Sequence, residues 1–193
     1  IFSANGIKVY LFESLRPTPE ISFAIRQLGC QAGVNITASH NPAKYNGYKA
    51  YWNDGCQLVP PHDTNVIAEV NKIASNDDVK WKGNEQNIIL WDELIDRPYI
   101  DAIKGLSING DIIKKQKDLK IVYTPIHGTG IKLVPRVLQE LGFENVNVVE
   151  EQAVVSGEFP SLRKPGVGEI KEEDFETEKD WLNKIHEVTG SPN

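Results

Sequence analysis

Strand-like runs alternate with helical patterns along this chain, and this alternation restricts the fold to the α/β class. Runs rich in β-branched and aromatic residues predict strands at 7–12, 33–37 and 47–52. Apolar residues at helical spacing predict helices at 18–28 and 62–75. We therefore expect α/β layers built on a mixed sheet, with helices covering the strands.

The same alternation restarts in the second half of the chain. It follows a polar stretch, residues 76–118, that contains a helical pattern near 92–104 and a basic linker. A strand at 119–124, a helix at 131–141 and a strand at 145–150 then form one β-α-β unit. A unit that begins again after a charged linker predicts a second domain.

We place the first domain at residues 1–110, the second at 111–160 and a divergent acidic helical tail at 161–193. Four apolar residues share one stripe of the predicted tail helix: Trp181, Leu182, Ile185 and Val188. The chain starts in the middle of a pattern and without Met, so we expect it to be a piece of a longer protein.

Charge and cysteine content narrow the class of protein. The formal net charge of -6 argues against non-specific binding to nucleic acids. Cys30 and Cys56 form no CxxC pattern, which argues against a disulfide framework or a structural zinc site. No apolar run approaches the roughly 20 residues of a membrane span, and no signal peptide is visible. These features predict a cytoplasmic protein with reduced thiols.

The loop after the second predicted strand has an unusual composition, because residues 36–49 read ITASHNPAKYNGYK. One interpretation is structural, since the dipeptides Asn-Pro and Asn-Gly within it are turn formers. Ser39 would then cap the turn, and His40 would be a surface residue.

A second interpretation of this loop is chemical. Ser39 lies just past a strand, where α/β sheets usually place their sites. His40 offers a donor or a proton carrier, Asn41 an amide, and Lys49 a positive charge from the next strand. Together these groups suit a phosphoryl group better than an acyl group. The G-x-S-x-G and Walker A patterns are absent, and no carboxylate is placed for a serine-hydrolase triad.

The serine loop resembles the active-site serine loop of the α-D-phosphohexomutases, which include phosphoglucomutases and phosphomannomutases. The family signature T-[AG]-S-H-N-P, followed by N-G-[YF]-K, is matched by TASHNP and NGYK. RPTPE, DGCQLVPPHD, YTPIHGTG and SGEFP are similar to other parts of the longer bacterial phosphoglucomutases. The resemblance covers residues 1–160 and implies the first domain of a phosphohexomutase followed by the start of a similar second domain.

The resemblance implies a defined chemistry for this loop. Ser39 would be a phosphoserine that exchanges its phosphoryl group with a hexose phosphate, such as a glucose or mannose phosphate. His40 and Lys49 match positions that contact the phosphoryl group and assist proton transfer, and Asn41 would contact the phosphate beside them. A Mg²⁺ ion would bind the serine phosphate and a trio of aspartates, because Mg²⁺ suits phosphate and carboxylate oxygens.

Two residues outside the serine loop are further candidates for phosphate contact. Arg16 precedes the first predicted helix, where it could contact a phosphate or be a solvated residue. His127 in PIHGTG lies between a strand and a helix, where a phosphate can meet a helix N-terminus. Alternatively, His127 belongs to a structural turn.

Several parts of the family pattern are missing from the sequence. The D-x-D-x-D-R metal loop, the G-E-x-S-G sugar-selecting loop and the C-terminal phosphate-binding loop are absent, and LRKPGVGEIKEE replaces a P-N-P-E stretch. We therefore expect the chain alone to have little or no mutase activity. A non-catalytic interaction module that docks through Trp181 is the alternative. The choice among glucose, mannose and pentose phosphates and the oligomeric state stay open.

Overall fold

The computed structural model describes residues 1–39, 41 and 44–162. The chain divides into two units, Ile1–Glu158 and Phe159–Asn193, and the described part of the second contains one 3-10 turn, Pro160–Leu162. The predicted tail helix lies outside the described residues. The expected α/β class is confirmed by the alternation of strands and helices in the first unit.

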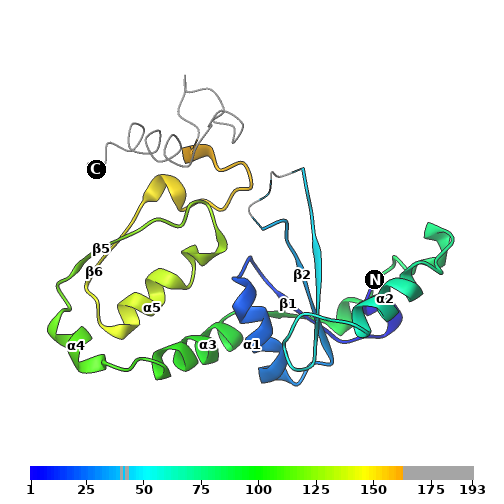
Figure 1. Ribbon diagram of the computed structural model, residues 1–193, viewed down its shortest axis with the longest axis horizontal. Helices are drawn as coiled ribbons and strands as arrows, with labels where there is room; N and C mark the ends of the chain where they lie inside the picture. Colours follow the sequence, from blue (N-terminus) through cyan, green and yellow to red (C-terminus); the bar gives the residue numbers. More distant parts are fainter. Residues whose placement is uncertain (40, 42–43, 163–193) are drawn as a thin grey trace. The chain divides into compact units, whose positions relative to one another are not determined.

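The strands of the described residues form three two-stranded sheets, two of them parallel and one antiparallel (Figure 1). The parallel pairs are β1 (Val9–Phe12) with β4 (Ile88–Trp91), and β5 (Lys120–Tyr123) with β6 (Asn145–Val148). The antiparallel pair is β2 (Ala32–Ile36) with β3 (Tyr48–Trp52). Parallel and antiparallel pairing therefore both occur in the described residues, but in separate two-stranded sheets rather than within one mixed sheet.

Five α-helices connect these strands within the described residues. They are α1 (Thr18–Leu28), α2 (His62–Val70), α3 (Glu93–Gly105), α4 (Gly110–Lys115) and α5 (Val134–Leu141). α1 ends where the sequence predicts, because Gly29 adopts a left-handed φ of 63° and its N–H bonds back to the last turn. α3 contacts both α1 and α5 and lies between them (Figure 1).

The helix α1 packs on one face of the β2–β3 hairpin. Gly33 of β2 makes this close approach possible, because a Cβ atom there would overlap the buried side chain of Ile25. Tyr51, which pairs with Gly33 across the ladder, is also buried. This contact holds α1 against the hairpin that carries Ser39.

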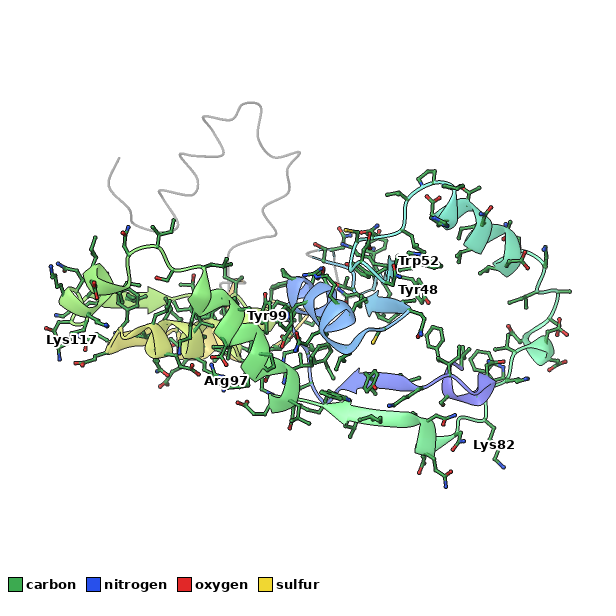
Figure 2. All side chains as sticks on the ribbon, turned by 90° about the horizontal axis from the view of Figure 1, so that it is seen from below. Tyr48, Trp52, Lys82, Arg97, Tyr99 and Lys117 are labelled. Carbon is green, nitrogen blue, oxygen red and sulfur yellow. The ribbon has the colours of Figure 1, made fainter. Side chains whose placement is uncertain are left out.

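The helix α3 uses different side chains toward its two neighbours (Figure 2). The Tyr99 ring lies 5.3 Å from the Phe23 ring of α1. Arg97 donates two hydrogen bonds, of 2.9 and 2.7 Å, to the Glu140 carboxylate of α5, which also accepts one from Arg136. The hydrogen bonds from Arg97, with those of the neighbouring cations, hold the pKa of Glu140 at about 2.

Several sequence-based boundaries differ from the observed ones. β4 and α4 were not predicted, because both lie in the polar stretch 76–118. α2 ends at Val70 rather than at residue 75, and a 3-10 turn, Thr129–Ile131, precedes α5. α1 begins at Thr18, as predicted, and Pro17 occupies its cap position. No helix within the described residues has the length and apolar character that crossing a bilayer requires.

Candidate active site

The loop that carries Ser39 connects β2 to β3 and is closed at its base. The N–H of Thr37 donates to the carbonyl oxygen of Gly47 over 3.0 Å. Only glycine fits at this place, because a Cβ atom on Gly47 would overlap that same carbonyl region of Thr37. The N–H of Gly47 is bonded to the Asn46 side-chain oxygen over 3.0 Å. The N-G part of the sequence pattern therefore closes the loop.

Ser39 is exposed and has a left-handed backbone, with φ of 59°. L-residues other than Asn and Asp rarely adopt this region, and such conformations concentrate at functional sites. The N–H of Ser39 donates to Thr37 Oγ1 over 3.0 Å, and the N–H of Asn41 donates to Ala38 O over 3.1 Å. These bonds shape the turn around the serine. His40 lies outside the described residues.

Lys49 lies on the same face of the hairpin as the helix α1. It pairs with Asn35 across the antiparallel ladder, and directly opposed residues share a face of the sheet. Asn35 Nδ2 donates to Thr18 Oγ1 over 2.9 Å, so Asn35 lies at the first turn of α1. Lys49 is two residues past Gly47. Lys49 therefore lies on the face of the hairpin that α1 covers, close to the base of the serine loop.

Asn35 was not identified from the sequence as part of this region. The available signal was an amide inside an otherwise apolar strand, GVNIT. Its partner Thr18 lies 17 positions earlier in the chain, so local spacing could not reveal the pair.

Arg16 is buried rather than solvated, which corrects one of the two alternatives for this residue. Its guanidinium makes a two-pronged contact with Asp96 of α3, through Nε at 2.7 Å and Nη2 at 2.9 Å. The remaining N–H groups donate to Glu13 Oε1 at 2.8 Å and to Ser14 Oγ at 2.7 Å, with weaker bonds to nearby carbonyls. A phosphate contact by Arg16 stays a prediction, and it would have to displace one of these partners.

Glu13 extends this cluster to the segment before α5. Lys132 Nζ donates to Glu13 Oε1 and lies 3.8 Å from Asp96 Oδ2. The hydrogen bond from Lys132, followed by that from Arg16, holds the pKa of Glu13 at about 2. The end of β1, the first turn of α3 and Lys132 are thereby joined by charge-assisted hydrogen bonds.

His127 occupies a tightly bonded turn after β5. Only 2% of its surface is exposed, and its backbone is left-handed with φ of 57°. Its N–H donates to Gln152 O over 3.0 Å, and its carbonyl accepts from Ser156 over 3.1 Å. Nδ1 lies 2.7 Å from the carbonyl oxygen of Val154, so this nitrogen carries the hydrogen. These bonds favour the structural interpretation of His127, and its phosphate contact stays a prediction.

The described residues do not fit a metal ion by themselves. Among residues 1–39, 41 and 44–162, no group of three or more His, Cys, Asp and Glu side chains is arranged to hold one. Two acids of the buried cluster, Glu13 and Asp96, are paired with Arg16 and Lys132. Ser39 would contribute phosphoryl oxygens only, so the expected Mg²⁺ has no carboxylate ligand set in this part of the chain.

Two family models match this sequence. The model of phosphoglucomutase/phosphomannomutase alpha/beta/alpha domain I matches residues 1–77, and that of domain II matches residues 97–184. The second match begins within α3 and continues into the predicted tail, whereas we placed the boundaries at 110 and 160. The domain boundaries stay a prediction.

Individual proteins of similar sequence are mutases of the same family. A phosphoglucomutase of Staphylococcus haemolyticus is 41% identical over 84% of this chain and 30% of its own length. A phosphopentomutase of Homo sapiens is 32% identical over 88% of this chain and 28% of its own length.

A solved structure is also similar to this chain. A Thermus thermophilus protein described as a phosphomannomutase superposes with a TM-score of 0.66 and 25% identity, over 82% of this chain and 34% of that protein. The chain thus spans about a third of the length of the proteins that it matches.

Proposed function

Because the chain belongs to the phosphoglucomutase/phosphomannomutase family, we propose that it carries the phosphoserine loop of a sugar-phosphate mutase. The observation that carries this proposal is the serine loop itself. Ser39 is exposed in a left-handed turn at the end of β2, and Lys49 lies on the adjacent strand on the face that α1 covers. The related proteins are named as mutases of glucose, mannose and pentose phosphates.

The proposed reaction has two transfers. A sugar hydroxyl oxygen attacks the phosphorus of phosphorylated Ser39, the Oγ–P bond breaks, and a base takes the hydroxyl proton. The sugar bisphosphate then turns, Ser39 Oγ attacks its other phosphorus, and the sugar oxygen of that phosphate recovers a proton. We assign His40 to the proton transfers. Catalysis of this kind depends mainly on positioning and on charge stabilisation.

Lys49 has an electrostatic part in this proposal. A phosphoserine carries about −1.5 to −2 charges at neutral pH, so an incoming sugar phosphate would be repelled without nearby cations. Lys49 supplies one such cation from the strand that follows the loop, and Asn41 offers an amide within it. When bound, Mg²⁺ would supply further neutralisation; the Ser39 phosphoryl group would hold it, and no carboxylate set for it occurs among residues 1–39, 41 and 44–162.

Mass spectrometry of Ser39 tests the proposal directly. We expect one additional phosphate on the peptide that contains Ser39, in protein purified without phosphatase or after incubation with a hexose bisphosphate. The Ser39→Ala variant should lose it, whereas Ser107→Ala, at an exposed serine in another loop, should keep it. A phosphate that persists in Ser39→Ala, or none after incubation, would contradict the proposed role of this loop. Turnover of glucose phosphates by the 193-residue chain would separately show whether this part of the protein acts alone.

A further inference from the structure

A carboxyl group in the first turn of α1 has no ordinary hydrogen-bond partner. The Glu20 side chain is completely buried, and neither of its oxygens accepts a hydrogen bond. Buried polar atoms in proteins almost always have partners, so an exception requires a physical explanation. An ionised carboxylate in this position would also carry a large desolvation cost.

The nearest cation does not compensate Glu20. Arg16 Nε lies 2.7 Å from Asp96 Oδ1 but 3.8 Å from Glu20 Oε2. Arg16 Nη2 also donates a hydrogen bond to Asp96, over 2.9 Å. Arg16 therefore neutralises Asp96, and Glu20 remains beside an acid that is already paired.

The charges of the cluster balance without Glu20. Arg16 and Lys132 supply two positive charges, and Glu13 and Asp96 supply two negative ones. An ionised Glu20 would leave one net negative charge inside a region where Asp96 is only 1% exposed. A neutral Glu20 avoids this uncompensated charge.

Other groups that face Glu20 do not offer a better partner. Besides Arg16, the charged and titratable groups that act on it are Asp96 and Lys132, and it acts in turn on the Tyr99 phenol of α3. Lys132 is already bonded to Glu13. Asp96 is the neighbour that can accept a hydrogen bond from a protonated Glu20, because its carboxylate oxygens are acceptors.

We propose that Glu20 is protonated at neutral pH and donates its carboxyl hydrogen to Asp96, so that a shared proton joins α1 to α3. In this arrangement one of the two unpartnered oxygens of Glu20 becomes a hydrogen-bond donor, and the other belongs to a neutral carboxyl group rather than to a buried charge. Loss of the proton to solvent at alkaline pH would place two carboxylates side by side, and the contact between the first turns of α1 and α3 would loosen. The inference does not depend on the mutase chemistry of Ser39.

The electrostatic surroundings support this assignment. Burial, and then the neighbouring Asp96, raise the pKa of Glu20 to about 8. Burial acts in the same direction on Asp96, but the hydrogen bonds from Arg16 and Glu20, together with the positive charges of Arg16 and Lys132, outweigh it and lower the pKa of Asp96. Opposite shifts within a carboxyl pair are expected when one member holds the proton and the other holds the charge.

Carboxyl NMR titration of the 193-residue protein tests the proposal without any variant. We expect the Glu20 side-chain carbon to report a pKa of about 8, well above the ordinary glutamate value of 4.5. In Asp96→Asn, Arg16 becomes available to Glu20, so the Glu20 midpoint should fall. Titration of Glu20 together with the exposed glutamates in the unmodified protein would overturn the proposal.

Unfolding as a function of pH gives an independent measurement. Between the ordinary pKa of 4.5 and about 8, folding would take up one proton at Glu20, so stability should fall as pH rises through this window. This contribution amounts to a tenfold fall in the folding equilibrium constant per pH unit. Glu20→Gln should lose this fall, because the amide is neutral and can still donate to Asp96. The control Glu69→Gln should retain it, and parallel profiles for Glu20→Gln and the unmodified protein would refute the proposal.

Discussion

The Arg16 side chain lies at the centre of a buried cluster, and its contribution to stability can be isolated. Replacement by Met removes the cation that pairs closely with Asp96 and leaves that buried carboxylate with the more distant Lys132, 3.8 Å away, as a remaining cation. We expect Arg16→Met to lose about 3 kcal/mol or more of unfolding free energy, measured by urea denaturation at neutral pH. The control is Arg26→Met, because Arg26 is exposed and bonds only to Ser22 Oγ and a carbonyl.

The outcome also separates the two functions considered for Arg16. Much greater loss in Arg16→Met than in Arg26→Met would support the structural role. Similar small losses in both variants, accompanied by weaker binding of inorganic phosphate in Arg16→Met, would favour the phosphate contact instead.

At the residue scale, the sequence predicts what is local and misses what is distant. Ser39 and Lys49 were singled out as candidates because their loop is a contiguous pattern of chemically distinctive residues. Glu20 and Asp96 were not singled out as a pair. Arg16 and Asp96 are 80 positions apart, so no spacing rule connects them. Only the packing of α1 against α3 brings the two acids together.

Gly47 controls the hairpin that presents the serine. A methyl group there would press on Thr37, whose N–H closes the loop through the Gly47 carbonyl. We expect Gly47→Ala to lose about 1–3 kcal/mol of stability and to reduce the fraction of Ser39 that carries phosphate. Urea denaturation and peptide mass spectrometry measure these two effects.

A matched substitution checks that this effect is local. Gly105 in α3 has open space around the position of a Cβ atom, so Gly105→Ala should preserve both stability and the Ser39 phosphate. Equal losses in Gly47→Ala and Gly105→Ala would show that the closed base of the loop is not the cause.

At the element scale, periodicity predicted most strands and helices but not β4. The four residues of β4 follow a polar, turn-rich stretch, and a run this short carries little periodic signal. β4 is held by its pairing with β1, which lies much earlier in the sequence. α2 was predicted too long because its apolar spacing continues past Val70, where the backbone leaves the helix.

Acid sensitivity is a property of the whole first unit. The pKa of Glu13 is held at about 2 mainly by Lys132, and that of Glu140 mainly by Arg97. Both values lie below the ordinary 4.5, so these groups stabilise the protein above pH 4.5, and this stability is lost as pH falls toward 2. We expect the unfolding midpoint in urea to fall through that window.

The double variant Glu13→Gln, Glu140→Gln should flatten this acid limb, while the decline between pH 4.5 and about 8 that we assign to Glu20 remains. An acid limb of unchanged steepness in the double variant would contradict the prediction. High salt should also flatten the limb, because these ion pairs are partly exposed and are screened.

The parallel pairing of β1 with β4 has a consequence for how the chain acquires its structure. Val9 pairs with Ile88, so α1, the serine hairpin and α2 all lie in the sequence between the two paired strands. The hairpin needs only a short turn and can form early, whereas the β1–β4 pair must wait for a long loop to close. On a ribosome, the serine loop would therefore emerge and fold well before the strand that completes its support has been synthesised.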